Sequence, residues 1–217
     1  MIAERQAMIQ RIRAALGDIP ATERPDEATV PRSYRTADTL TDAQRTDLFI
    51  ERVREYKAAV RTVAPDDLPR AIDAACKARG MKRLVIPAGL PETWAPTDLM
   101  ILRDPGLAND LLEQSDGVLT AVALGIAQTG TIVLDSGPGQ GRRVLTLLPD
   151  YHLCVIHEDQ IVGLVPEAVA RLRAAAEDSH RPITFISGPS ATSDIELNRV
   201  EGVHGPRTLE VLVVSRG

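Results

Sequence analysis

Two kinds of apolar pattern alternate along this chain, one with a helical period and one of short uninterrupted runs. The clearest helical pattern follows Thr41, which with Gln44 has the form of a capping box, and its apolar positions continue to Val60. Uninterrupted apolar runs bounded by turn residues are typical of buried strands. We expect helices at 41–60, 67–79, 107–114 and 166–177, and strands at 60–63, 83–86, 99–102, 118–122, 131–134, 153–157, 183–187 and 209–215.

Strands without polar alternation must bury both faces, which requires a layer above and a layer below the sheet. The alternation of such strands with helices predicts an α/β fold, a three-layer α/β/α sandwich with a mostly parallel sheet. In open sheets of this kind, ligands bind beyond the carboxyl ends of the strands. The glycine-containing loops between the predicted strands are therefore the candidate functional segments.

The N-terminal residues form a separate segment. Apolar residues recur on one face of residues 2–16, and Gly17 stands where a helix C-cap is expected. Residues 18–40 contain three prolines and no sustained period, which is typical of an extended or mobile linker. We predict an N-terminal helix and variable linker over residues 1–40, and one α/β domain over residues 41–217.

The amino-acid composition argues against nucleic acid and membranes as partners. With 44% hydrophobic residues, 25% charged residues and a net charge of -5, the 217-residue chain has an ordinary globular composition. It lacks the basic stripe expected of a protein that binds nucleic acid or an anionic membrane. It also lacks a stretch of about 20 apolar residues and an apolar signal-peptide core. We therefore expect a cytoplasmic protein with no membrane span.

Cysteine and histidine spacing gives no support for a metal site. The two cysteines, Cys76 and Cys154, do not form a C-x-x-C pair, so the chain alone cannot supply the ligands of an iron–sulfur cluster or a Cys-rich zinc site. No H-x-x-x-H pattern occurs either. We expect two buried free thiols and no metal, and the sequence leaves any other cofactor unknown.

The first candidate loop lies between two apolar runs. Its members are Gln128, Thr129, Gly130 and Thr131. The glycine permits close approach of a ligand, and the threonines offer hydroxyls to a phosphate, carboxylate or cofactor amide. A tight turn with threonines chosen for their β propensity explains the same residues, so both interpretations stay open.

A second segment, 136–143, contains three glycines and ends in Arg142 and Arg143. The glycines predict a flexible crossing, and the two guanidinium groups match the paired oxygens of a carboxylate or phosphate. The segment has neither a P-loop ending nor a GxGxxG spacing. A solvated surface loop is the alternative interpretation.

The densest polar segment is 187–196, which follows a predicted strand. Its candidate ligand-binding residues are Ser187, Gly188, Ser190 and Thr192, and its candidate catalytic carboxylates are Asp194 and Glu196. This concentration of hydroxyls at the end of a strand favours a binding role over helix capping. The two carboxylates are two residues apart and diverge on a helix, so their spacing alone does not make them an acid–base pair.

The last candidate loop, 202–207, precedes the final strand. His204 is flanked by glycines, one of them Gly205, and Arg207 follows as an anion partner. His204 is a candidate general acid or base because its ordinary pKa lies near neutrality. The remaining histidines are weaker candidates, since two bracket a strand and one lies in a polar turn: His152, His157 and His180.

Four segments taken in order resemble the lactate-utilization domain (LUD) family, and within it the short lactate utilization protein C branch. They are A-Q-T-G-T-I-V-L at 127–134, L-P-D-Y-H-L at 148–153, S-G-P-S-A-T-S-D-I-E at 187–196 and G-V-H-G-P-R at 202–207. The resemblance is strong over 118–215 and carries few motifs over 41–114. It implies a fold similar to that of the sugar-phosphate isomerase and coenzyme A transferase superfamily.

The resemblance also implies a place in a system that oxidises L-lactate to pyruvate, alongside partners that carry iron–sulfur clusters. The family often has an acidic residue where this chain has Gln128. An amide forms hydrogen bonds but cannot act as a carboxylate nucleophile or base, which argues against covalent chemistry of the coenzyme A transferase kind.

Three functional hypotheses follow. The first is a non-iron–sulfur accessory protein or subunit of L-lactate oxidation that binds a small anionic ligand at these loops. The second is a stand-alone isomerase- or transferase-like enzyme acting on a sugar phosphate, coenzyme A ester or folate-like substrate. In it, Asp194, Glu196 and His204 would transfer protons, and the arginines at 142, 143 and 207 would hold the anion. The third is an interaction module whose residues 1–40 dock on a partner.

Overall fold

A computed structural model describes residues 2–17, 31, 33–177, 180–192, 200–201 and 205–216. The chain divides into two compact units, Met1–Tyr34 and Arg35–Gly217. In the first unit the helix expected at residues 2–16 is present as α1 (Ile2–Ala15). All strands and the candidate binding residues belong to the second unit.

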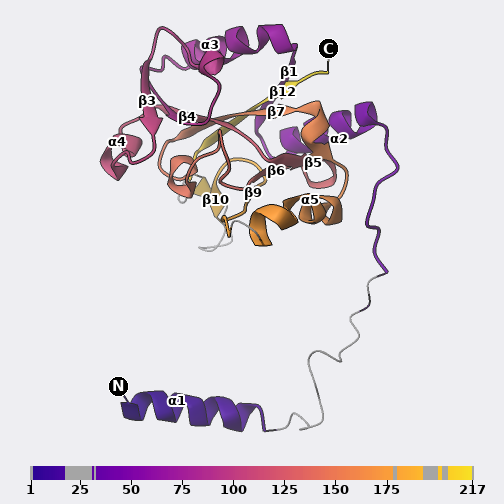
Figure 1. Ribbon diagram of the computed structural model, residues 1–217, viewed down its shortest axis with the longest axis vertical. Coiled ribbons are helices and arrows are strands. Elements are labelled where there is room, and N and C mark those ends of the chain that lie inside the picture. The colour runs from indigo at the N-terminus through magenta and orange to yellow at the C-terminus, as the bar shows by residue number, and fades with distance from the viewer. Residues whose placement is uncertain are drawn as a thin grey trace. The chain divides into compact units, whose positions relative to one another are not determined.

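The second unit is built on a six-stranded sheet in the order β1-β12-β7-β4-β2-β3 (Figure 1). Every neighbouring pair is parallel. The strands are β1 (Ala59–Val63), β2 (Arg83–Pro87), β3 (Met100–Asp104), β4 (Gly117–Ala121), β7 (Tyr151–His157) and β12 (Thr208–Val214). The parallel sheet predicted from the uninterrupted apolar runs is therefore confirmed.

A second sheet was not expected. Its strands, in the order β8-β5-β6-β9, are β5 (Leu124–Ile126), β6 (Thr131–Leu134), β8 (Ile161–Val162) and β9 (Thr184–Ile186). The apolar runs at 131–134 and 183–187 thus lie outside the parallel sheet, and β6 is antiparallel to both of its neighbours. The connection from β5 to β6 is too short for a parallel crossover, so the chain must reverse. A short hairpin, β10 (Ala191–Thr192) with β11 (Val200–Glu201), completes the described strands.

The helices of this unit are α2 (Asp42–Glu55), α3 (Leu68–Ala78), α4 (Asn109–Glu113) and α5 (Val165–Glu177). Short 3-10 turns are η1 (Pro65–Asp67), η2 (Glu92–Trp94), η3 (Ala127–Thr129), η4 (Arg143–Thr146) and η5 (Glu158–Gln160). The capping box is confirmed, with the Thr41 amide donating to Gln44 Oε1 at 3.0 Å. The prediction that α2 runs to residue 60 is wrong, because Lys57 turns the chain with a positive φ of 63° and β1 begins at Ala59.

Alternate residues of β12 point to opposite faces of the parallel sheet. Leu212 packs with α3, whereas Val211 packs with Phe49 of α2 and with the second sheet. Helix α5 covers the outer face of the second sheet through Leu172. Figure 1 shows this order of layers, with α3 on one side of the parallel sheet and α2 and α5 on the other. The α/β sandwich is confirmed, with a second sheet inserted between the parallel sheet and α5.

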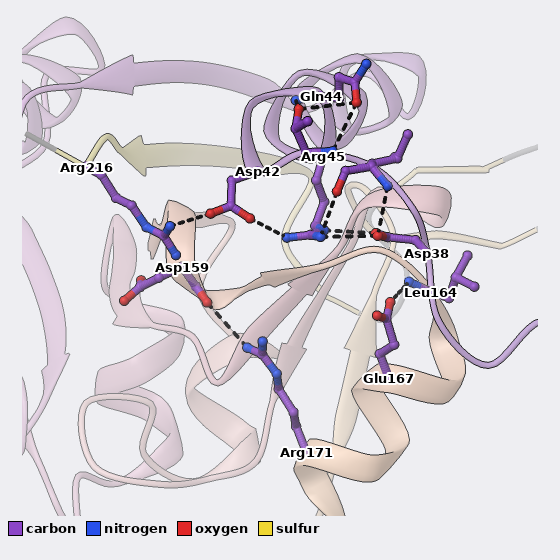
Figure 2. A network of polar contacts seen from close by, with 11 residues as sticks. Asp38, Asp42, Gln44, Arg45, Asp159, Leu164, Glu167, Arg171 and Arg216 are labelled. Atoms are coloured by element: carbon purple, nitrogen blue, oxygen red, sulfur yellow. Dashed lines mark hydrogen bonds and ion pairs between the residues drawn. The ribbon is translucent and has the colours of Figure 1, made fainter.

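Residues 35–40, which the sequence assigned to the linker, belong to the second unit and are bonded to α2 (Figure 2). The Asp38 carboxylate accepts hydrogen bonds from Arg45 Nε at 2.9 Å and from the Leu40 amide at 3.1 Å. It also lies directly against Gly163, where an added Cβ would stand 1.5 Å from Asp38 Oδ2. Proline content and the absence of a period do not reveal an ion pair of this kind, so the compact unit begins before residue 41.

Candidate functional site

The fold brings together three of the segments singled out in the sequence. The Thr131 hydroxyl hydrogen-bonds to Ser187 Oγ at 2.8 Å, which joins the first loop to the segment after β9. The Ser190 amide donates to the Pro206 carbonyl at 2.8 Å, which joins that segment to the loop before β12. The contacts connect residues that are far apart in the chain, so only folding places them side by side.

Beside these contacts lies a cavity of about 300 Å³, here called the loop cavity. Five of the predicted ligand-binding residues line it: Arg143, Ser187, Gly188, Ser190 and Gly205. Its walls also include His152 and Leu209, near the amino ends of β7 and β12. The sequence predicted a site beyond the carboxyl ends of the parallel strands. The loop cavity differs because the loop at 205–207 precedes β12 and must lie where that strand begins.

Arg143 is the side chain of this cavity that is suited to an anion. It stands at the start of η4, half-buried, and its guanidinium donates to the Thr146 carbonyl at 3.0 Å and to Thr146 Oγ1 at 2.7 Å. Both acceptors are neutral, and among the described residues no carboxylate pairs with Arg143. Burial lowers the pKa of this guanidinium, which still stays charged at neutral pH. Its positive charge is therefore not neutralised within the described part of the chain.

The other arginines near these loops differ from Arg143. Those that the structure describes are each bonded to a carboxylate: Arg142 to Asp104, Arg181 to Asp135 and Arg207 to Asp150. Arg142 is held most firmly, since its Nε and Nη2 contact Asp104 at 2.8–3.1 Å and the Asp104 side chain is 4% exposed. Arg207 is 65% exposed and does not line the loop cavity. The two predicted anion partners at 142 and 207 thus already have internal anions.

His152 lines the loop cavity although the sequence ranked it below His204. It is 1% exposed, and its Nε2 lies 2.8 Å from Thr120 Oγ1. Burial, together with the positive charge of Arg143, lowers the pKa of His152 to about 3. The ring is therefore neutral at pH 7 and offers hydrogen bonds without charge. A polar residue inside an otherwise apolar strand was the signal that could have singled it out.

The first candidate loop has a clear packing role. Gly130 adopts a left-handed φ of 57°, and a Cβ there would lie 2.6 Å from the backbone of Arg52 in α2. Gln128 and Thr129 border a separate hollow of about 310 Å³ next to the same helix. Thr131 is buried and bonds to Ser187, so it supports the wall of the loop cavity from behind.

Several predicted residues lie outside what the structure describes. Asp194, Glu196 and His204 are among residues 193–199 and 202–204, and only the backbone of Thr192 is placed, in β10. In the described residues, no group of three or more His, Cys, Asp or Glu side chains is arranged to hold a metal. Cys76 and Cys154 are both buried and pack on opposite faces of the parallel sheet. Burial raises the pKa of the Cys76 thiol to about 11.

A larger cavity of about 420 Å³ lies at the carboxyl ends of β2 and β3. It is called the proline cavity, because its walls include Pro87, Pro105, Pro138 and Pro182. Arg142 and Arg143 both line it, so Arg143 borders the two cavities. This is the edge of the sheet where the parallel arrangement predicted a ligand.

The glycine-rich wall of the proline cavity was expected to be flexible, and the structure shows it held by specific bonds. The Asp135 amide donates to Gln140 Oε1 at 2.6 Å, and Gly137 donates back to Asp135 Oδ1 at 3.1 Å. The Ala121 amide at the end of β4 donates to the Gly139 carbonyl at 2.8 Å. Side-chain acceptors such as Gln140 therefore supply the order that glycine content alone does not predict.

Comparison with known proteins shows what this chain is similar to. Residues 106–214 match the LUD domain. A lactate utilization protein C from Deinococcus radiodurans is 47% identical over 197 residues, which are 90% of each chain. A protein of the same name from Halalkalibacterium halodurans is 29% identical over the full length of both. A crystal structure of a DUF162 family protein from Deinococcus radiodurans superposes with a TM-score of 0.71 at 41% identity, over 81% of this chain and 99% of that one.

Proposed function

This chain belongs to the LUD domain family, and we propose that it acts in lactate utilization by binding a small organic carboxylate at Arg143 in the loop cavity. The observation that carries the proposal is the positive charge of Arg143, which borders the cavity and has no carboxylate partner among the described residues. A half-buried guanidinium without an internal anion gains most from an external one.

The other groups of the cavity suit the remainder of a 2-hydroxy or 2-oxo acid. Ser187 contributes a hydroxyl whose orientation is fixed by Thr131. His152 is neutral and its Nε2 is held by Thr120, so it adds a fixed polar wall without a charge that would repel Arg143. Gly188 has a positive φ of 88°, and an added Cβ would lie 2.6 Å from Tyr56 Cβ, so glycine lets this wall of the cavity pack against Tyr56.

We place the electron transfer of lactate oxidation on a separate partner. The chain has two cysteines, fewer than the four that a typical iron–sulfur cluster requires. Both thiols are buried on opposite sides of one sheet, so they cannot ligate a common metal. These positions support the hypothesis of a non-cluster subunit that works with an iron–sulfur protein.

Isothermal titration calorimetry with L-lactate and pyruvate tests the proposal. In Arg143→Gln the affinity should fall by a factor of about 10 to 100, since a hydrogen bond to a charged group contributes about 1.5–3 kcal/mol. Arg207→Gln is the matched control, because it removes an equal charge that is already paired with Asp150 at the surface. Equal losses in the two variants, or no binding of either acid to the wild-type chain, would contradict the proposal.

A growth experiment tests the cellular role. Deletion of the gene should prevent growth on L-lactate and leave growth on pyruvate intact. The wild-type chain, supplied to the deletion strain, should restore growth on L-lactate. The Arg143→Gln variant should restore growth on L-lactate poorly, and the Arg207→Gln variant should restore it fully. Unimpaired growth of the deletion strain on L-lactate would remove lactate utilization from the proposal.

The second hypothesis, a stand-alone enzyme, rests on Asp194, Glu196 and His204 and stays a prediction. It differs from the binding proposal in one measurable respect, which is turnover by the isolated chain. Loss of that turnover in Asp194→Asn or His204→Ala, with the fold retained, would favour the enzyme over the binding subunit.

A further inference from the structure

Arg143 borders two cavities, and only one of them is needed for an acid as small as lactate. The loop cavity has a volume of about 300 Å³ and the proline cavity about 420 Å³. At roughly 30 Å³ for each water-sized group, a lactate ion fills on the order of half of the loop cavity alone. Arg143 lines both cavities, so a carboxylate bound to its guanidinium lies next to the proline cavity as well.

The walls of the proline cavity indicate the chemistry of the additional group. Four prolines and Ala88 form a large part of the lining, and proline has no backbone N–H to donate. The charge of Arg142, which also lines this cavity, is neutralised by Asp104. An uncharged, apolar group fits such walls better than a second anion, because burying an anion without a free cation is costly.

The proline cavity is also preformed. A Cβ on Gly89 would lie 2.8 Å from the Gly139 amide nitrogen, so the two loops that form its walls meet backbone to backbone. The Ala121 amide fixes the Gly139 carbonyl, and Asp104 fixes Arg142. A ligand that enters this space does not have to order its walls, and affinity is not lost to that ordering.

We propose that the chain binds a carboxylate with an apolar body at least as large as a phenyl ring, its carboxylate on Arg143 and its body in the proline cavity. This inference rests on the proposed binding of a carboxylate at Arg143. It adds a second compartment of the site and a class of ligand, the aryl- or alkyl-substituted 2-hydroxy acids.

A pair of probes with one head group measures the second compartment. L-lactate carries the acid alone, and L-3-phenyllactate adds a phenyl ring to the same carbon skeleton. In the wild-type chain, calorimetry should show phenyllactate binding at least about tenfold more tightly than lactate, because the ring leaves water for an apolar cavity.

Ala88→Leu fills the proline cavity from an exposed position of its wall and should reduce the ratio of the two affinities to about one. Ala78→Leu is the matched control, since Ala78 is an exposed alanine on α3 that lines neither cavity and should keep the ratio. Circular dichroism checks that both variants are folded. If Ala88→Leu does not fold, Pro105→Leu, at another exposed position of the same wall, replaces it.

Each result separates this inference from the proposed function. Equal affinities of the two acids in the wild-type chain would overturn it and leave carboxylate binding at Arg143 standing. The inference would also be overturned if Ala88→Leu kept the wild-type ratio of phenyllactate to lactate affinity. The same holds if Ala78→Leu lost this ratio as completely as Ala88→Leu. Failure of both acids to bind would overturn the inference and the proposed function together.

Discussion

Arg143 is half-buried, and in the described part of the chain its guanidinium donates to two neutral oxygens of Thr146. Among the described residues this guanidinium gives up part of its hydration without gaining a carboxylate, which is costly. The neighbouring Arg142 shows the ordinary solution, with Asp104 buried beside it. Two adjacent residues of one type thus have different partners, a buried carboxylate for Arg142 and neutral oxygens for Arg143.

His152 gives a pH prediction at the same scale. Its pKa is lowered to about 3 in the folded chain and is about 6.5 when unfolded. Between these values the unfolded chain binds a proton that the folded chain does not, so stability is fully present above pH 6.5 and decreases as the pH falls. The expected contribution to the slope is up to about 1.4 kcal/mol per pH unit.

Urea unfolding of the wild type and His152→Gln between pH 7 and pH 5 measures this contribution. The variant should lose stability less steeply than the wild type as the pH falls, whatever its absolute stability. His180→Gln, at an exposed position, is the control for the removal of a histidine side chain at the surface. Identical slopes in the wild type and His152→Gln would show that His152 does not titrate as the structure requires.

At the scale of elements, the turn η3 between two strands of the second sheet packs against α2. The connection from β5 to β6 passes through η3 and reverses at Gly130. The same reversal carries Thr131, which bonds to Ser187 beside the loop cavity. The packing of one short turn against a helix therefore positions one wall of the candidate site.

Gly130→Ala tests this contact. The substitution should cost about 2–4 kcal/mol, because it combines about 1–2 kcal/mol of left-handed backbone strain with overpacking against Arg52. Gly80→Ala is the matched control, since Gly80 has a φ of 61° and open space around its Cβ position. It should cost only the backbone strain. Equal losses of unfolding free energy in the two variants would show that packing on α2 contributes nothing.

At the scale of the whole molecule, the ion pair between Asp38 and Arg45 ties the chain before α2 to the body of the second unit (Figure 2). The same network continues through Asp42 to Arg216 near the C-terminus. Glu167 accepts the Leu164 amide at 2.6 Å at the start of α5, beside the Asp38 contact with Gly163. Segments from both ends of this unit are thus linked in series, because Arg45 contacts both Asp38 and Asp42, and Arg216 contacts Asp42. Among the described residues, each helix is too short or too polar to cross a membrane.

Asp38→Asn should lower the free energy of unfolding by about 1.5–3 kcal/mol at pH 7, the contribution of a hydrogen bond to a charged group. The hydrogen bonds from Arg45 lower the pKa of Asp38, so its stabilisation is present above the unfolded pKa of about 3.8 and is lost as the pH falls through the lower folded value. The difference between wild type and variant should therefore shrink in acid.

Glu177→Gln is the control for Asp38→Asn, because it breaks an exposed pair with Arg173 and should cost at most about 1 kcal/mol. Denaturant unfolding at pH 7 and pH 3 measures the loss of unfolding free energy in each variant and how far that loss shrinks in acid. A loss in Asp38→Asn no larger than in Glu177→Gln would mean that residues 35–40 are not held by this pair.

The sequence by itself determined the features that depend on neighbouring residues. Uninterrupted apolar runs gave the parallel strands, and the spacing of Thr41 and Gln44 gave the start of α2, since both are local properties of the chain. The ordered motifs gave the family, which the match over residues 106–214 bears out.

Only the tertiary structure decided which polar residues have partners. Arg142 finds Asp104 across 38 residues and Arg207 finds Asp150 across 57, whereas Arg143 finds no carboxylate in the described residues. The second sheet and the place of His152 in the loop cavity were likewise decided by packing. The physical reason is that the hydrophobic period is a property of residues close together in the sequence. Whether a charged side chain is paired and buried depends on segments that only the fold brings together.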